Sequence, residues 1–198
     1  KSSFDLNKIF RINSPDKFEH TILSSNERSS LQEKIFDFFT EQIKKHQENL
    51  KAGCTTYAKN LSDIFDEFAM NAIWDANTKY KDCDRTQVIK LKPSEQVEIS
   101  CFSDGYYFIL KVKDPFGTFD DKSIGCNMNN TLAATEAKEV NHGTGGAGIG
   151  LIMTLQKIGT LVFEIDPQKS TTAYAIAEGT QSIREMQRRK KSILFFKK

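Results

Sequence analysis

The chain lacks several features that would assign it a function directly. Its four cysteines are scattered without a Cys-x-x-Cys pair, which argues against a zinc site or disulfide framework and fits reduced thiols. The three histidines do not cluster in the sequence either. No apolar run approaches the roughly 20 residues that a membrane helix needs, and we read no signal peptide. We therefore expect a cytoplasmic protein with no membrane span.

A strong charge of either sign is also lacking. Lys and Arg number 28 against 26 Asp and Glu, a formal net charge of +2. This balance does not favour a polyanionic partner, so we expect no direct binding to nucleic acid. A length of 198 residues with 38% hydrophobic content is sufficient for one domain with a core. We expect that domain over residues 18–180, after an N-terminal strand or linker segment (1–17) and before a C-terminal extension (181–198).

The C-terminal extension combines a basic run with an apolar one. Arg184 and residues 188–191 supply the basic groups, and the apolar residues 193–196 follow them. A basic run is most often a solvated helix face, and the alternative is a surface that docks a partner or an anionic surface. We expect the apolar residues to pair either with residues 4–12 or with a second copy of the chain, which would make a homodimer.

Apolar periodicity predicts helices in the first half of the chain. The capping-box pattern from Ser30 to Glu33 predicts a helix that begins near residue 30 and runs to about residue 48. A second helix is expected after Gly53. Its predicted buried positions are Tyr57, Leu61, Ile64, Phe68 and Ala72.

Alternating apolar residues predict strands in the rest. In addition to strand-like segments at 4–12 and 18–23, we expect strands at 88–91, 97–102, 106–112, 160–165 and 171–178. A long polar connection over residues 115–142 follows the strand expected at 106–112. One more helix comes after it, before the strand expected at 160–165. This order predicts an α+β fold, a two-layer α/β sandwich in which helices cover one face of a mostly antiparallel sheet.

A glycine-rich run precedes the last predicted helix. Five glycines fall within residues 143–151. Glycine lets an anion approach the backbone, and a helix N-terminus offers unpaired N–H groups, so the run favours a phosphate-binding loop. The alternative is a mobile surface loop. No Lys follows these glycines, which excludes the Walker arrangement.

Two further segments carry polar residues beside apolar ones. Glu67, Asn71 and Asp75 are spaced to share one face of the second helix, next to its buried stripe. They form either one wall of a cleft or an ordinary solvated face. Asp114 and Gly117 follow a predicted strand. They suit recognition of an exocyclic amine and a flat ring, although Asp-Pro and Gly are also common in turns.

Together, these segments resemble the GHKL, or Bergerat-fold, ATPase superfamily, whose domain is the histidine-kinase-like ATPase domain. Glu67, Asn71 and Ala72 match its N box, residues 143–151 match its G2 box, and Thr171 matches its closing threonine. The resemblance covers about residues 18–178. The chain is most similar to the anti-sigma-factor serine kinase branch. The similarity lies in residues 118–120 and in the short series of one helix and two strands that follows the glycine run.

The resemblance implies a site for ATP and Mg²⁺. Asp114 is expected to accept a hydrogen bond from the adenine amino group, Asn71 to ligate Mg²⁺, and Glu67 to act as the general base. An acidic residue at 75 would repel phosphates at close range, so Asp75 is expected to help hold the metal or to point away. The implied nucleotide-binding set is Asn71, Asp75, Asp114, Gly117, Gly143, Gly145, Gly146, Gly148, Gly150 and Thr171.

The activity that the resemblance implies is ATP-dependent serine/threonine phosphorylation of a protein partner in partner-switching regulation. That partner would be a sigma factor, an anti-anti-sigma-like protein or an attached regulatory domain. One alternative is a nucleotide-responsive binding module with little turnover. Another is the catalytic domain of a histidine kinase, whose phosphoacceptor would lie outside this chain, since neither His20 nor His46 is followed by an acidic residue.

Overall fold

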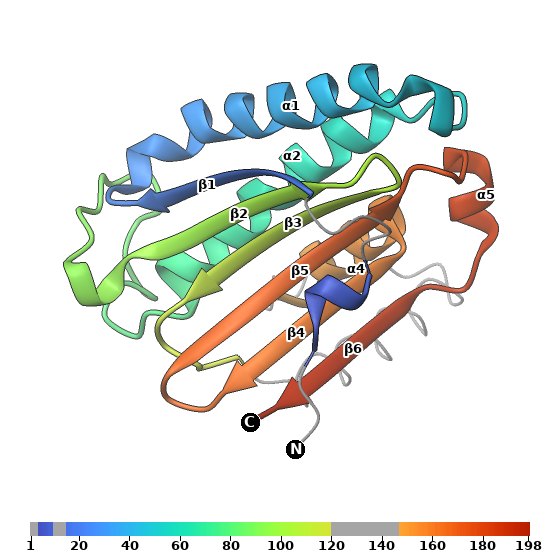
Figure 1. Ribbon diagram of the computed structural model, residues 1–198. Helices are drawn as coiled ribbons and strands as arrows, with labels where there is room; N and C mark the ends of the chain where they lie inside the picture. Colours follow the sequence, from blue (N-terminus) through green and yellow to red (C-terminus); the bar gives the residue numbers. More distant parts are fainter. Residues whose placement is uncertain (1–3, 10–14, 120–146) are drawn as a thin grey trace, which may run out of the picture.

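The structure is a computed structural model and describes residues 4–9, 15–119 and 147–198. Its centre is a six-stranded open sheet of order β1-β2-β3-β5-β4-β6 (Figure 1). The neighbouring strands are antiparallel except for β4 and β6, which are parallel. The strands are β1 (Asp16–Ile22), β2 (Val97–Ser103), β3 (Tyr107–Asp114), β4 (Thr160–Asp166), β5 (Ser170–Glu178) and β6 (Ser192–Lys197).

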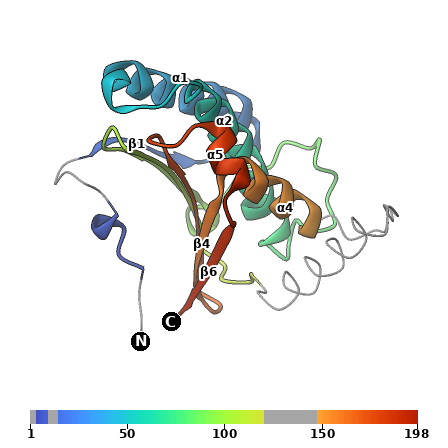
Figure 2. The ribbon, with the colours of Figure 1, turned by 90° about the vertical axis from the view of Figure 1, so that its right-hand side faces the viewer.

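The helices of the described residues lie on one face of this sheet (Figure 2). They are α1 (Arg28–Lys45), α2 (Thr55–Met70), α4 (Ala147–Ile158) and α5 (Ile183–Arg188). The predicted α+β class, the mostly antiparallel sheet and the placement of helices on one face are therefore confirmed. The helix expected directly after the glycine run is α4.

The core lies between the helices and the sheet. Leu31, Ile35 and Phe39 of α1 are buried at helical spacing, and Phe108 and Leu110 of β3 are buried opposite them at a spacing of two. Burying a large apolar side chain fully contributes about 1.5–3 kcal/mol, so these stripes fix how the helices sit on the sheet.

Helix α1 starts earlier than predicted. The capping box is formed by Ser24 and Glu27, whose carboxylate accepts the N–H of Ser24 at 2.8 Å and that of Leu23 at 3.0 Å. The short 3-10 turn η2 (Ser25–Glu27) then leads into α1 at Arg28. The prediction of a helix start at Ser30 is wrong because Ser30 already lies inside the helix and donates its hydroxyl to the carbonyl oxygen of Glu27.

The N-terminal segment is not a strand where it is described. Leu6–Lys8 form a 3-10 turn, and the Asp5 carboxylate accepts the N–H of Asn7 at 3.1 Å. The predicted strand over 4–12 is therefore wrong for residues 4–9, while 10–12 lie outside the described residues. The segment packs on the sheet face away from the helices, where the ring of Phe4 lies 4.9 Å from that of Tyr174.

Most of the other strand predictions are confirmed. The strands expected at 97–102, 106–112, 160–165 and 171–178 are β2, β3, β4 and β5, with ends shifted by one or two residues. The strand expected at 88–91 is reduced to one bridge between Lys90 and Ser24. The backbone N–H of Ile89 bonds the Ser25 hydroxyl at 2.9 Å, so a side chain replaces part of the ladder there.

The C-terminal apolar residues form β6 within the same sheet. Strand β6 pairs with β4 in parallel, and the N–H of Ser192 donates to the carbonyl oxygen of Gly159 at 2.9 Å. The backbone of the tail therefore pairs with β4 and not with residues 4–9, although the ring of Phe4 lies 5.8 Å from that of Phe196. The alternative of a second copy stays a prediction. On the side of β6 that faces the helices, the ring of Phe195 stacks on that of Phe163 at 5.6 Å.

In the part of the chain that the structure describes, no helix combines the length and apolar character needed to cross a membrane.

Candidate functional site

The C-terminal end of α2 brings together two of the predicted site residues. Helix α2 widens into one π-helical turn, η4 (Asn71–Asp75), where the N–H of Ala76 bonds the carbonyl oxygen of Asn71 at 2.8 Å. The Asn71 side chain is close enough to the Glu67 carboxylate to lower the pKa of that group. Such π turns occur frequently at functional sites. The two residues therefore lie near each other, as their spacing on the helix predicted.

The surroundings of Glu67 favour its protonated form. Burial raises the pKa of Glu67, and the nearby carboxylates Asp75 and Asp66 act in the same direction. The Arg85 guanidinium and the nearby Asn71 side chain lower the pKa of Glu67 and only partly offset these effects. A carboxylate with a raised pKa is a stronger base than a free one, which suits proton abstraction.

Asp75 is paired with a cation. One of its carboxylate oxygens, Oδ1, lies 2.7 Å from the Arg85 guanidinium, and both side chains are partly exposed. An exposed ion pair contributes at most about 1 kcal/mol, so its main effect is to offset the negative charge of Asp75 beside Glu67. Arg85 was not predicted as a site residue, because it lies ten residues beyond Asp75 in a polar segment without periodicity.

The end of β3 holds a buried carboxylate. Asp114 is 7% exposed, and its Oδ1 accepts the N–H of Phe116 at 2.9 Å and that of Gly117 at 3.3 Å. Burial raises the pKa of Asp114, against the lowering by these donors and by Thr171. These contacts fix the Asp114 carboxylate at the end of β3, and its expected role as an acceptor for a ligand's amine stays a prediction.

Thr171 lies directly opposite Asp114 in the pairing of β3 with β5. Its hydroxyl is close enough to the Asp114 carboxylate to lower the pKa of that group. This buried hydroxyl nevertheless makes no hydrogen bond of good geometry with any described residue. A buried polar atom left in this way calls for an explanation, and a bound ligand is one.

Gly117 is required by its own neighbours. Its φ is +64°, and a Cβ there would lie 2.2 Å from the carbonyl oxygen of Asp166 in the β4–β5 turn. The carbonyl oxygen of Gly117 accepts the N–H of Gln168 at 3.3 Å. This contact accounts for glycine at 117 without a ligand, so its expected part in nucleotide binding stays a prediction.

One hydrogen bond joins the ends of α2 and β3. Thr118 donates its hydroxyl to the carbonyl oxygen of Ala76 at 2.9 Å. The adjacent Asn77 is buried, and its side-chain nitrogen has no partner among the described residues. No motif or helical spacing in the sequence marks Asn77. Asp114 and the Glu67–Asn71 pair are therefore held on connected elements.

The glycine run is described in part. Gly148 and Gly150 lie in the first turn of α4, whereas Gly143, Gly145 and Gly146 are outside the described residues. The other end of α4 is fixed to α2, because Asn60 donates to the carbonyl oxygen of Lys157 at 2.8 Å. Within the described ranges, no group of three or more His, Cys, Asp or Glu side chains is placed to hold a metal ion.

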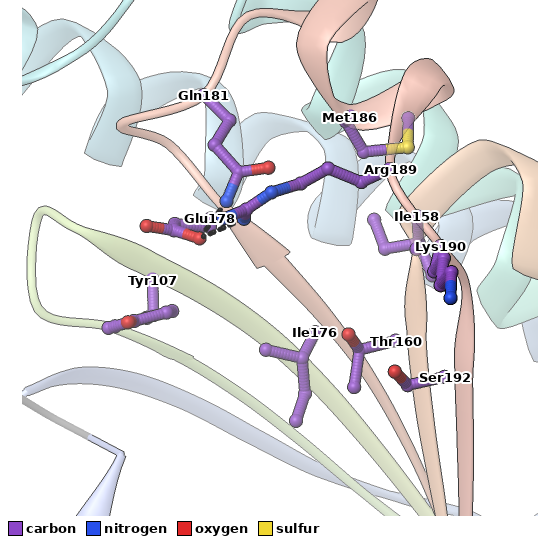
Figure 3. A pocket seen from close by; sticks show the side chains of 11 residues that line it. Tyr107, Ile158, Thr160, Ile176, Glu178, Gln181, Met186, Arg189, Lys190 and Ser192 are labelled. Carbon is purple, nitrogen blue, oxygen red and sulfur yellow. Dashed lines mark hydrogen bonds and ion pairs between the residues drawn. The ribbon is translucent and has the colours of Figure 1, made fainter.

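A separate hollow opens at the far end of the sheet (Figure 3). This α5 pocket, of about 340 Å³, is lined among others by Tyr107, Ile176, Glu178, Arg189, Lys190 and Ser192. Tyr107 and Asp114 are the two ends of β3, so a rise of about 3.3 Å per residue places the backbone of Tyr107 at the pocket about 23 Å from that of Asp114. It is not part of the site predicted from the sequence.

Comparison with models of known protein families finds none that matches the chain, and comparison with curated proteins finds no significant match.

Proposed function

We propose that this chain is an ATP-binding domain of the histidine-kinase-like ATPase superfamily with the Bergerat fold, acting as an anti-sigma-factor-like serine/threonine protein kinase. One observation carries the proposal. Asp114 and Thr171 place a buried carboxylate beside a buried hydroxyl that makes no hydrogen bond of good geometry with a described residue. Thr118 ties this pair to the helix end that holds Glu67 and Asn71.

The adenine end of the nucleotide belongs at Asp114 in this proposal. Its carboxylate accepts a hydrogen bond from the exocyclic amine, and the Thr171 hydroxyl supplies a donor or acceptor beside it. Burial keeps water from competing for both groups. A purine with a carbonyl oxygen in place of the amine would meet the carboxylate as a second acceptor, so the site favours ATP over GTP.

The phosphate end belongs at the end of α2 and the start of α4. The side-chain oxygen of Asn71 is a hard ligand of the type that Mg²⁺ prefers. Mg²⁺ with ATP would supply the transferable phosphoryl group and neutralise its charge. Backbone N–H groups of the glycine run, Gly148 and Gly150 among them, are the expected phosphate donors. Glu67 takes the proton from a serine or threonine hydroxyl of the partner protein.

Thermal unfolding with ATP, ADP and GTP, each with and without Mg²⁺, tests nucleotide binding, because a ligand of the folded state raises the unfolding midpoint. We expect the largest rise with ATP and Mg²⁺, and little with GTP. Asn71→Ala should remove the Mg²⁺-dependent part, and Asp114→Asn most of the whole rise. Asn49→Ala and Asp37→Asn change exposed or half-exposed residues elsewhere and serve as matched controls. If neither site variant weakens the response to ATP, the nucleotide site is wrong.

Transfer of labelled γ-phosphate to candidate partner proteins tests the kinase activity. Glu67→Ala should abolish transfer and leave ATP binding largely intact, because the base acts on the acceptor hydroxyl. ATP binding without transfer or hydrolysis, unaffected by Glu67→Ala, would identify a nucleotide-responsive binding module instead.

A further inference from the structure

Strand β6 forms one edge of the sheet, with β4 on its inner side (Figure 1). The N–H groups of Ser192 and Lys198 both donate to the β4 side, to the carbonyl oxygens of Gly159 and Ile165. In a parallel pair, backbone groups point alternately toward and away from the neighbour. The N–H and C=O groups of Ile193 and Phe195 therefore point out of the sheet, and no described residue hydrogen-bonds to them.

The two edges of the sheet differ in how much charge they carry. Strand β1 carries Asp16, Lys17 and Glu19, the kind of charged residues that blunt an edge against further pairing. Strand β6 carries one charged residue, Lys197 at its C-terminal end, and Leu194 in its centre is 45% exposed. An exposed apolar edge of this kind is a template for another strand.

The face of β6 that contacts the core holds this edge in place. The Phe195 ring stacks on Phe163 at 5.6 Å and lies 6.3 Å from the ring of Phe119. Ile193 packs against the main core cluster. Because β6 is fixed by these contacts, its outward groups are presented in a regular row, and β6 itself loses little conformational entropy when another strand pairs with it.

Basic residues surround the edge. Residues 184–198 contain seven of the chain's 28 Lys and Arg but one of its 26 Asp and Glu, so the remaining residues carry 21 basic against 25 acidic groups. Arg189 is partly neutralised by Glu178 at 3.4 Å. Arg188 and Lys190 form no ion pair with a described residue, and Lys190 lies at the α5 pocket beside the start of β6 (Figure 3).

The basic charge around β6 favours some partner strands over others. Antiparallel pairing of two β6 strands would bring Lys198 of one copy close to Lys191 of the other, and like charges at both ends would oppose the pairing. A segment with acidic residues at its ends and alternating apolar residues in its centre meets no such repulsion.

We propose that the β6 edge binds an extended, acidic-ended segment of a partner protein, which adds to the sheet as a seventh strand. Backbone groups of Ile193 and Phe195 supply the hydrogen bonds, and Leu194 provides an apolar contact. Arg188 and Lys190 attract the acidic ends, with the α5 pocket receiving a side chain next to Ser192. This surface is independent of the nucleotide site.

Amide hydrogen exchange of the full chain tests this placement with a synthetic probe. The probe is a short peptide that alternates valine and threonine in its centre and carries aspartates at both ends, and the control peptide carries lysines at its ends instead. We expect the aspartate peptide to slow exchange of the Ile193 and Phe195 amides about tenfold or more, and the lysine peptide to leave both unchanged.

Two pairs of variants separate the backbone contribution from the charge contribution. Ile193→Pro removes one outward N–H without touching the bonds to β4, and Ile193→Ala truncates the same side chain but keeps the N–H. Relative to Ile193→Ala, Ile193→Pro should weaken peptide binding about tenfold. Arg188→Glu with Lys190→Glu should weaken it comparably, and more at low salt than at high salt. Far-ultraviolet circular dichroism confirms that each variant is folded.

Three results would overturn the proposal. The first is slow exchange at Ile193 and Phe195 in the monomer without peptide, which would mean that the chain covers its own edge. The second is protection that depends on protein concentration, which would identify a second copy as the occupant. The third is equal binding of both peptides, or binding of single-stranded DNA in place of the acidic peptide.

Discussion

Asp114 and Thr171 lie directly opposite each other at neighbouring ends of β3 and β5, and both are almost fully buried. Burial raises the pKa of the Asp114 carboxyl, and the Thr171 hydroxyl beside it lowers that pKa but makes no hydrogen bond of good geometry with a described residue. Such an arrangement costs stability, because a buried polar group that is incompletely bonded loses its contact with water. A ligand that completes the hydrogen bonds of Asp114 and Thr171 would offset this loss of stability.

The first prediction is that Asp114→Asn increases the stability of the ligand-free protein at pH 7. Because burial raises the pKa of Asp114 in the fold, the folded state binds its proton more readily than the unfolded chain. This contribution to stability is therefore present at low pH and is lost as pH rises through the folded-state pKa. Asparagine carries no charge and avoids that loss. Urea unfolding at pH 7 and near pH 3 measures the difference in unfolding free energy between the two proteins. We expect this difference to disappear at the lower pH.

The second prediction is that the same variant binds ATP more weakly. A hydrogen bond to a charged group contributes about 1.5–3 kcal/mol, so affinity for ATP should fall about ten- to hundredfold in Asp114→Asn. Isothermal titration calorimetry at pH 7 measures the change. A variant that is less stable and binds ATP normally would show that Asp114 is a structural residue only.

The third prediction concerns the charge near Glu67. Arg85 lowers the pKa of Glu67 and pairs with Asp75, so Arg85→Ala removes a cation and leaves an unpaired carboxylate nearby. Both changes should raise the pKa of Glu67 further. Carbon NMR titration of the Glu67 carboxyl group measures this directly, without any activity. Lys81→Ala removes an exposed cation from the same segment and should leave the titration almost unchanged.

The architecture followed from the sequence where a pattern was long and regular. The buried stripes of α1 and α2 and the alternating burial along β2 to β5 follow from the spacing of apolar residues, which can be read from the sequence. Local signals were weaker. Two Ser-to-Glu spacings, Ser24 to Glu27 and Ser30 to Glu33, compete for the start of α1, and Ser24 also forms a bridge with the distant Lys90, which a local pattern cannot reveal. The position of β6 required knowledge of Phe163, which lies about thirty residues earlier.

The candidate site shows the same division. The spacing of Glu67 and Asn71 predicted their shared face, since a helix repeats every 3.6 residues. The partner of Asp75 and the orphaned groups of Asn77 and Thr171 depend on contacts between distant segments, which no periodicity encodes. For Gly117, the sequence suggested an approach to a ligand, and the structure adds a steric need from the β4–β5 turn.

The fourth prediction tests that steric need. Gly117→Ala places a Cβ against the backbone of Asp166 at a φ of +64°, and should destabilise the fold by about 3 kcal/mol or more. Gly53→Ala is the matched control, because Gly53 has a φ of +85° and nothing within 4 Å of its Cβ position. The Gly53→Ala variant should lose only about 1–2 kcal/mol of unfolding free energy, the cost of holding a residue with a Cβ at positive φ. Urea unfolding measures both, and equal losses would show that the turn accommodates the methyl group.

The fifth prediction concerns the attachment of β6. Phe195→Ala removes ring contacts with Phe163 and Phe119 and should cost about 1.5 kcal/mol, since an aromatic pair contributes about 0.5–1.5 kcal/mol beyond burial. Leu194→Ala, next to it on the other face of the strand and 45% exposed, should cost less than about 0.5 kcal/mol. Thermal unfolding compares the two, with about 2–4 °C expected per kcal/mol in a chain of this length. A cycle of Phe195→Ala and Phe163→Leu measures the coupling directly. Additive losses in that cycle would mean that the two rings do not hold β6 to the sheet.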